Sequence, residues 1–129
     1  MSACGAVQTG IFAKLNAVAG LAGRVFDDVP QGTAYPHVVI EIAADTERGT
    51  DDSTGESSLV RVHTWSVYHG FKEVQDFQAL IFTALDRQEI TVSGYQFISC
   101  DYVQDLRMLD PDGETRHGVS EYRVMTDPL

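Results

Sequence analysis

The hydrophobic period of this chain switches between helix and strand spacing in a fixed order, and that order limits which folds the chain can adopt. Residues 5–20 and 71–85 carry apolar side chains at the spacing of helices that pack by one face. The other apolar segments alternate with period two, as strands do. The predicted order is therefore helix, three strands, helix and three further strands.

These elements can be assigned to particular residues. The first helical stripe is Val7, Ile11, Leu15 and Val18, and the second is Phe71, Val74, Phe77, Ile81 and Leu85. Strands are expected at 24–26, 37–44, 59–68, 89–92, 95–109 and 117–126. Strands grouped with few helices indicate an α+β domain, in which a mostly antiparallel sheet carries both helices on one face.

Two turn signals mark hairpins in the second half of the chain. The sequence Asp110-Pro111-Asp112-Gly113 places proline where φ must be about −65° and glycine where φ can be positive. Ser93-Gly94 is a two-residue connection of the kind that hairpins use. We therefore expect 95–109 to pair both with 89–92 and with 117–126.

Length and charge bound the function. A chain of 129 residues fits a single domain over residues 1–129, and such a domain buries roughly two thirds of its unfolded surface. Nineteen acidic residues against nine Lys and Arg give a formal net charge of −10. A surface this negative repels the phosphate backbone, so conventional DNA binding is disfavoured.

Two segments, 45–57 and 101–114, carry eight of the ten net negative charges. The first of them, DTERGTDDSTGES, contains no aliphatic or aromatic side chain. It cannot bury apolar surface, so we expect a mobile acidic loop over residues 45–57 of an isolated subunit. The simplest interpretation of both segments is a solvated, charged surface.

Nothing in the sequence indicates a membrane segment, a secretory signal or a metal site. The apolar runs are far shorter than the roughly 20 residues that span a bilayer. We therefore expect the chain to stay in the cytoplasm where it is made. Cys4 and Cys100 are then expected to be reduced thiols, and neither has a second Cys or a His at ligand spacing.

The acid–base residues form no recognisable catalytic motif. The histidines stand apart, without an HxH or HxxxH pair, and are interpreted as surface or interface residues: His37, His63, His69 and His117. Asp27-Asp28 is better explained as a turn initiator than as a catalytic carboxylate pair. No GxxxxGK loop or GxSxG elbow is present. The sequence therefore predicts neither an enzyme nor a cofactor.

Trp65 is open to two interpretations. It shares one strand face with Leu59 and Val67, which favours a core position between the sheet and the second helix. The alternative is an interface anchor, because aromatic residues dominate binding hot spots. We expect the core position.

Three segments, taken in order, resemble a known family: RVFDDVPQGTAYPHVVI at 24–40, VRVHTWSVYHGFKEV at 60–74 and DPDGETRHGV at 110–119. The sequence resembles the tail-completion or tail-terminator family of long-tailed bacteriophages and phage-like gene transfer particles. None of the segments is catalytic, so the resemblance rests on their order and spacing. It implies a compact subunit that assembles, six copies at a time, as a ring on the end of the tail tube.

The resemblance implies a structural function in the virion or particle. The hexamer would cap the tail tube, contact the tail tube protein and the head-tail connector, and let DNA pass through its lumen. The charged residues of the acidic loop are candidate contacts with a neighbour or partner ring: Asp45, Glu47, Arg48, Asp51, Asp52 and Glu56. The alternatives are a neck or head-completion protein of the adjacent ring, or a small soluble enzyme or ligand-binding domain.

Overall fold

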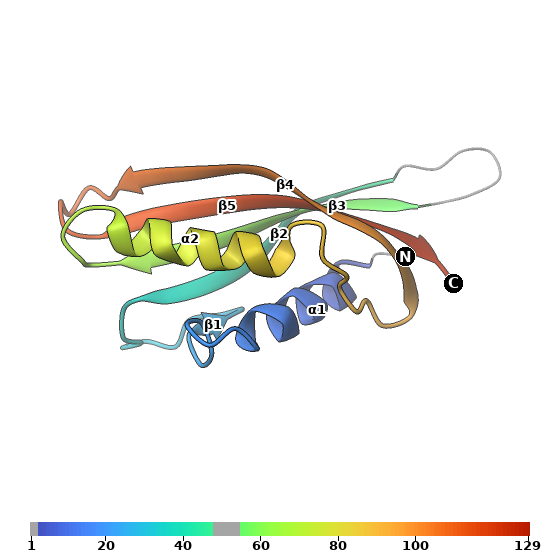
Figure 1. Ribbon diagram of the computed structural model, residues 1–129, viewed down its shortest axis with the longest axis horizontal. Coiled ribbons are helices and arrows are strands. Elements are labelled where there is room, and N and C mark those ends of the chain that lie inside the picture. The colour runs from blue at the N-terminus through green and yellow to red at the C-terminus, as the bar shows by residue number, and fades with distance from the viewer. Residues whose placement is uncertain (1–2, 48–54) are drawn as a thin grey trace.

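A computed structural model describes residues 3–47 and 55–129 as two helices packed on a five-stranded sheet. In chain order the elements are α1 (Cys4–Asn16), β1 (Val25–Phe26), β2 (His37–Glu47), β3 (Glu56–Ser66), α2 (Lys72–Leu85), β4 (Tyr95–Leu109) and β5 (Arg116–Pro128). The strand order is β1-β2-β3-β5-β4, in which only the β1–β2 pair is parallel. Figure 1 shows both helices on the same side of the sheet. The predicted α+β architecture is therefore confirmed.

The core lies between the helices and the inner face of the sheet. Strand alternation sends every second side chain of β2, β3 and β5 to that face, where it meets the apolar stripes of α1 and α2. The buried contacts from the sheet are Val38, Ile40, Val60, Val62, Tyr122 and Val124. Those from the helices are Val7, Ile11 and Leu15 in α1 and Phe77, Ile81 and Leu85 in α2. Both predicted helical stripes thus face the sheet.

The turn between β4 and β5 forms as its sequence predicts. The Asp112 carboxylate accepts main-chain N–H bonds from Glu114 and Thr115, each of 2.8 Å, and the N–H of Gly113 donates to Asp110. Gly113 has a φ of 75°, which few other residues adopt without strain. These hydrogen bonds lower the pKa of Asp112, first through Thr115. The turn holds β4 and β5 in one hairpin.

The prediction of a strand over residues 89–92 is wrong. Ile90 and Val92 are buried, but the segment joins no ladder in the described part of the chain. It is held against α1 instead, where a side chain at Gly10 would collide with the carbonyl oxygen of Thr91. Apolar residues two apart fit this packed loop as well as they fit a strand, so the alternation misled the prediction.

Several predicted boundaries also move. The first helix ends at Asn16 instead of reaching residue 20. Residues 45–47 and 56–57, expected in the acidic loop, are strand residues that pair across the hairpin, with Glu47 opposite Glu56. Pairing through main-chain groups does not require apolar side chains, which is why the polar composition hid it. Of the remaining loop residues, Gly55 is buried just before β3, and residues 48–54 lie outside the described residues.

The orientation of α2 can be tested by mutation. Ile81→Ala should lower the free energy of unfolding by about 2 to 5 kcal/mol, because it removes most of a fully buried side chain and leaves a cavity in its place. Asp76→Ala, on the exposed face of the same helix, should change it by less than about 0.5 kcal/mol. Urea unfolding of the two variants would measure both values. Equal losses would mean that the helix faces the other way.

Candidate functional site

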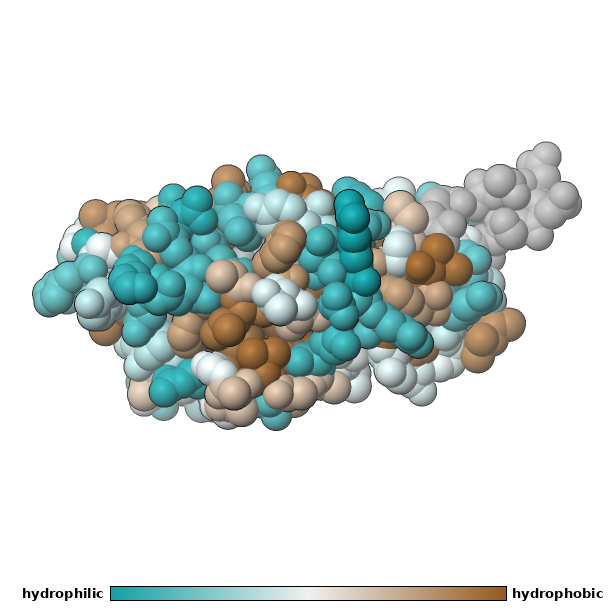
Figure 2. All heavy atoms as spheres, viewed as in Figure 1, coloured by the Kyte–Doolittle hydropathy of each residue, from teal (hydrophilic) through white to brown (hydrophobic). Residues whose placement is uncertain are grey.

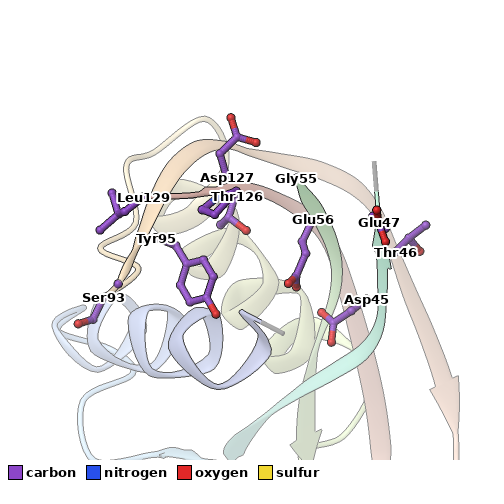
Figure 3. Close-up of a pocket in the computed structure, with 12 residues that line it drawn as sticks. Asp45, Thr46, Glu47, Gly55, Glu56, Ser93, Tyr95, Thr126, Asp127 and Leu129 are labelled. Atoms are coloured by element: carbon purple, nitrogen blue, oxygen red, sulfur yellow. The ribbon is translucent and has the colours of Figure 1, made fainter. Parts of the chain in front are cut away.

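An acidic pocket of about 790 Å³ lies at the end of the sheet where the β2–β3 hairpin meets the C-terminus (Figure 3). Carboxylates from three strands surround it, and the described residues that line it include no Lys, Arg or His. Residues of β2 and β3, the turn before β4 and the end of β5 line it: Asp45, Thr46, Glu47, Gly55, Glu56, Ser93, Gly94, Tyr95, Thr126, Asp127, Pro128 and Leu129. The pocket therefore has a negative potential that attracts cations.

Strand pairing positions the carboxylates of this acidic pocket. Asp45 lies opposite Ser58 and accepts a hydrogen bond of 2.8 Å from its hydroxyl. Glu56 accepts a hydrogen bond of 2.9 Å from the main-chain N–H of Ala3, which connects β3 to the start of the chain. Figure 3 shows the side chains of Asp45, Glu56 and Tyr95 turned toward the same space. The local folds of two hairpins thus converge on one acidic surface.

Three of the six candidate contact residues lie at the acidic pocket, namely Asp45, Glu47 and Glu56. The other three, Arg48, Asp51 and Asp52, lie outside the described residues. Sequence reasoning missed Asp127, which belongs to a strand end 70 or more positions away in the sequence. Among the described residues, no group of three or more His, Cys, Asp or Glu side chains is arranged to hold a metal ion.

A second polar arrangement occupies the outer face of the sheet, which the helices leave uncovered. Trp65 of β3 stacks on His117 of β5, with ring centroids 3.8 Å apart and planes 8° from parallel. His117 in turn stacks on His63, 5.0 Å away. We call these three residues and Glu41 the aromatic stack.

The expectation that Trp65 packs against the second helix is wrong. Trp65 does share a face with Leu59, but Val60 and Val62 occupy the inner face, so the strand directs Trp65 outward. Both faces of β3 carry apolar residues, and the sequence therefore could not decide which face meets the helices. The alternative interpretation, an interface anchor, stays a prediction.

Hydrogen bonds join the aromatic stack into one chain of donors and acceptors. His63 Nε2 lies 2.8 Å from Glu41 Oε1, and His63 Nδ1 lies 2.8 Å from His117 Nε2. When Nε2 of His63 donates to Glu41, Nδ1 of a neutral His63 accepts the N–H of His117. Protonating both rings would place two donors against each other. Burial is the main effect that lowers the pKa of His117, and the charge of His63 lowers this pKa further. The charge of Asp110 acts in the opposite direction and raises it.

The next row of the outer face is ionic. Arg61 Nε donates to Glu121 Oε2 at 2.7 Å, and Gln104 donates to Glu121 Oε1 at 2.6 Å. These two hydrogen bonds, Arg61 first, lower the pKa of Glu121, although its side chain is only 8% exposed. The carboxylate is thereby held as an anion on a face without helices. No spacing in the sequence indicates these contacts, because β3 and β5 are separated by α2 and β4.

Comparison with known proteins decides the family. The sequence matches the family Tail completion protein gp17 over residues 9–127. The chain belongs to this family. It is 27% identical over 103 residues to Tail completion protein gp17 of Bacillus phage SPP1, and this match covers 80% of the chain and 76% of the relative. The family predicted from the sequence is thus confirmed.

Solved structures agree with this family. The fold is similar to the structure of the bacteriophage SPP1 gp17 protein, with a TM-score of 0.64, 26% identity, and coverage of 95% of this chain and 89% of that one. It is also similar to a chain in the virion of a native gene transfer agent particle, with a TM-score of 0.91 and 98% of both chains covered. At 17% identity, the second likeness concerns the fold.

In the described residues, no helix combines the length and apolar character needed to cross a bilayer.

The aromatic stack predicts a pH-dependent stability. Because the folded protein lowers the pKa of His117 below its ordinary value of 6.5, the unfolded chain binds more protons just below that pH. The free energy of unfolding should therefore fall as the pH decreases from about 7 to about 5, and His117→Gln should reduce that fall. Urea unfolding followed by the fluorescence of Trp65 would measure it. His69→Gln, at an exposed position after β3, is the matched control and should behave like the unmodified protein.

Proposed function

We propose that this protein is the tail terminator of a phage or phage-like particle. Six copies form a ring that caps the tail tube, stops further tube subunits from adding, and joins the tail to the head connector. The observation that carries the proposal is the match to a tail completion family across residues 9–127, nearly the whole chain. The fold that it shares over 98% of its length with a chain of a gene transfer agent virion supports the proposal.

The side-chain chemistry supports a structural function. The histidine cluster of the described residues is the aromatic stack, where His63 bonds both to His117 and to Glu41. The stacking of His117 on Trp65 and the pairing of His63 with Glu41 are contacts that stabilise a protein surface. The thiol of Cys100 fits the same view, since burial raises its pKa to about 12 and makes it a poor nucleophile.

The charge of the protein supports a ring around DNA. A net charge of −10 lets a DNA strand pass without adhering to the protein. The acidic pocket is our candidate contact with a partner ring. Its carboxylates would meet basic side chains of the tail tube or connector, and the candidate residues Asp51 and Asp52 would extend the same charge.

Removing the gene for this protein tests the proposal. Hosts that make particles without the protein should produce tails that exceed the normal length or fail to join heads, because nothing covers the growing end of the tube. Negative-stain electron micrographs would measure tail length and the fraction of joined heads. Tails of normal length joined to heads would reject the terminator function. Overlong tails would favour a terminator over a neck protein, because loss of a neck protein leaves the length of the tube unchanged.

Charge reversal tests the acidic surface. Replacing Asp51 and Asp52 with Lys should reduce particle assembly or DNA transfer at least tenfold, because the attraction to a basic partner becomes repulsion. The matched control replaces two exposed acids elsewhere, Asp76 and Glu89, with Lys, and should keep near-normal transfer. A transfer assay on both double variants gives the comparison. Equal loss in both would indicate a general effect of net charge.

A further inference from the structure

The edge of the sheet at β2 is open along most of its length. β1 pairs with only two residues of β2, Val38 and Val39. The N–H of Val38 points to β1, where it donates to Arg24. Because alternate residues of a strand address the same edge, the main-chain groups of Ile42 also point outward, beyond the end of β1. No described strand pairs with them.

Cavities flank this open edge on both faces of the sheet. One, of about 320 Å³, lies toward α1 and includes Phe12, Asp27 and Ile40. The other, of about 440 Å³, also includes Asp27 and Ile40 but extends over Glu41 to Trp65 on the outer face. An added strand directs its side chains alternately to the two faces, so it needs a pocket on each side. The open edge of β2 has both, and carboxylates line them.

The opposite edge of the sheet, β4, has the complementary character. β4 is 15 residues long, and 39–50% of the surface of each of its large exposed apolar residues is accessible: Ile98, Tyr102, Val103, Leu106, Met108 and Leu109. Hydrophobic spheres are visible along this rim in Figure 2. Bulges interrupt the pairing with β5 up to residue 104, after which residues 104–109 pair regularly. A regularly paired, exposed edge strand with Leu106, Met108 and Leu109 on its surface is a template for pairing with another chain.

We propose that residues 104–109 of one copy add to the open edge of β2 in the next copy and continue its sheet. Arg107 lies in this segment and is exposed, with one N–H donated to Gln78. Its charge complements Asp27 and Glu41 at the receiving edge. The inference rests on the proposed ring and names the contact that closes it.

The two edges differ, so the contact is head-to-tail. β4 and the β1–β2 side stand at opposite ends of the strand order. Each copy therefore binds one neighbour through its β4 edge and the other neighbour through its β2 edge. Contacts of this kind generate a closed ring when the rotations from subunit to subunit add up to a full turn. An edge strand that would otherwise invite aggregation is covered once every copy has a neighbour.

A charge exchange tests the contact. Arg107→Glu alone and Asp27→Arg alone should each raise the subunit concentration needed for ring formation at least tenfold, and the double variant should restore it. Native mass spectrometry and tails isolated from particles would report ring content. Thermal melts would follow the folding of each variant. Lys72→Glu, an exposed charge change on α2, is the control and should leave ring formation unchanged.

The outcomes separate this contact from the proposed function. Restoration in the double variant supports edge pairing, because a second substitution at Asp27, after β1 and on the other edge of the sheet, cannot repair a folding defect at Arg107. Rings that form normally in both single variants, or a double variant no better than the singles, would overturn the edge contact and leave the terminator function standing. Absence of rings from the unmodified protein, both free and on tails, would reject both proposals.

Discussion

The pairing of β3 with β5 is the constraint on which the rest of the structure depends. These strands are not consecutive, and an unbroken register of eleven residue pairs joins them at the centre of the sheet. On the inner face, this pairing brings Val60 beside Tyr122 and builds the floor of the core. On the outer face, it places Trp65 opposite His117. Neither the core nor the aromatic stack exists unless these two strands align.

The same pairing also buries polar side chains beneath α2. Several inward positions of the central strands are polar, and the hydroxyls of Thr64, Ser120 and Tyr122 have no hydrogen-bond partner among the described residues. A buried, unpaired hydroxyl costs about 1 to 3 kcal/mol. Gln78, which is also buried, is satisfied, because it bonds to the main chain of Leu106 and to Arg107 of β4. α2 is thus fastened to the edge strand by polar contacts as well as by its apolar stripe.

The sequence was sufficient to predict elements whose signals are local. Both helices follow from apolar spacing, and the β4–β5 turn follows from Pro111 and Gly113. Strand order and strand face depend on contacts between distant segments. Trp65 was assigned to the wrong face for that reason, and His63 and His117, 54 residues apart, were treated as separate. The acidic residues at the hairpin were located by composition alone, which could not reveal that Asp127 joins them.

The distribution of surface chemistry explains how one small domain can serve several contacts at once. The acidic pocket lies at one end of the sheet, beside the β2–β3 hairpin, whereas the aromatic stack lies on the outer face of the same strands, close to the turn before β5. The two unlike edges, β4 and the open part of β2, run between these regions. In the proposed ring the neighbour's segment covers the outer-face cavity from Glu41 to Trp65, so the end of the sheet that carries the acidic pocket stays available for a different partner. The proposed terminator ring would need such a division, because identical neighbours and axial partners would have to bind together without competing for one surface.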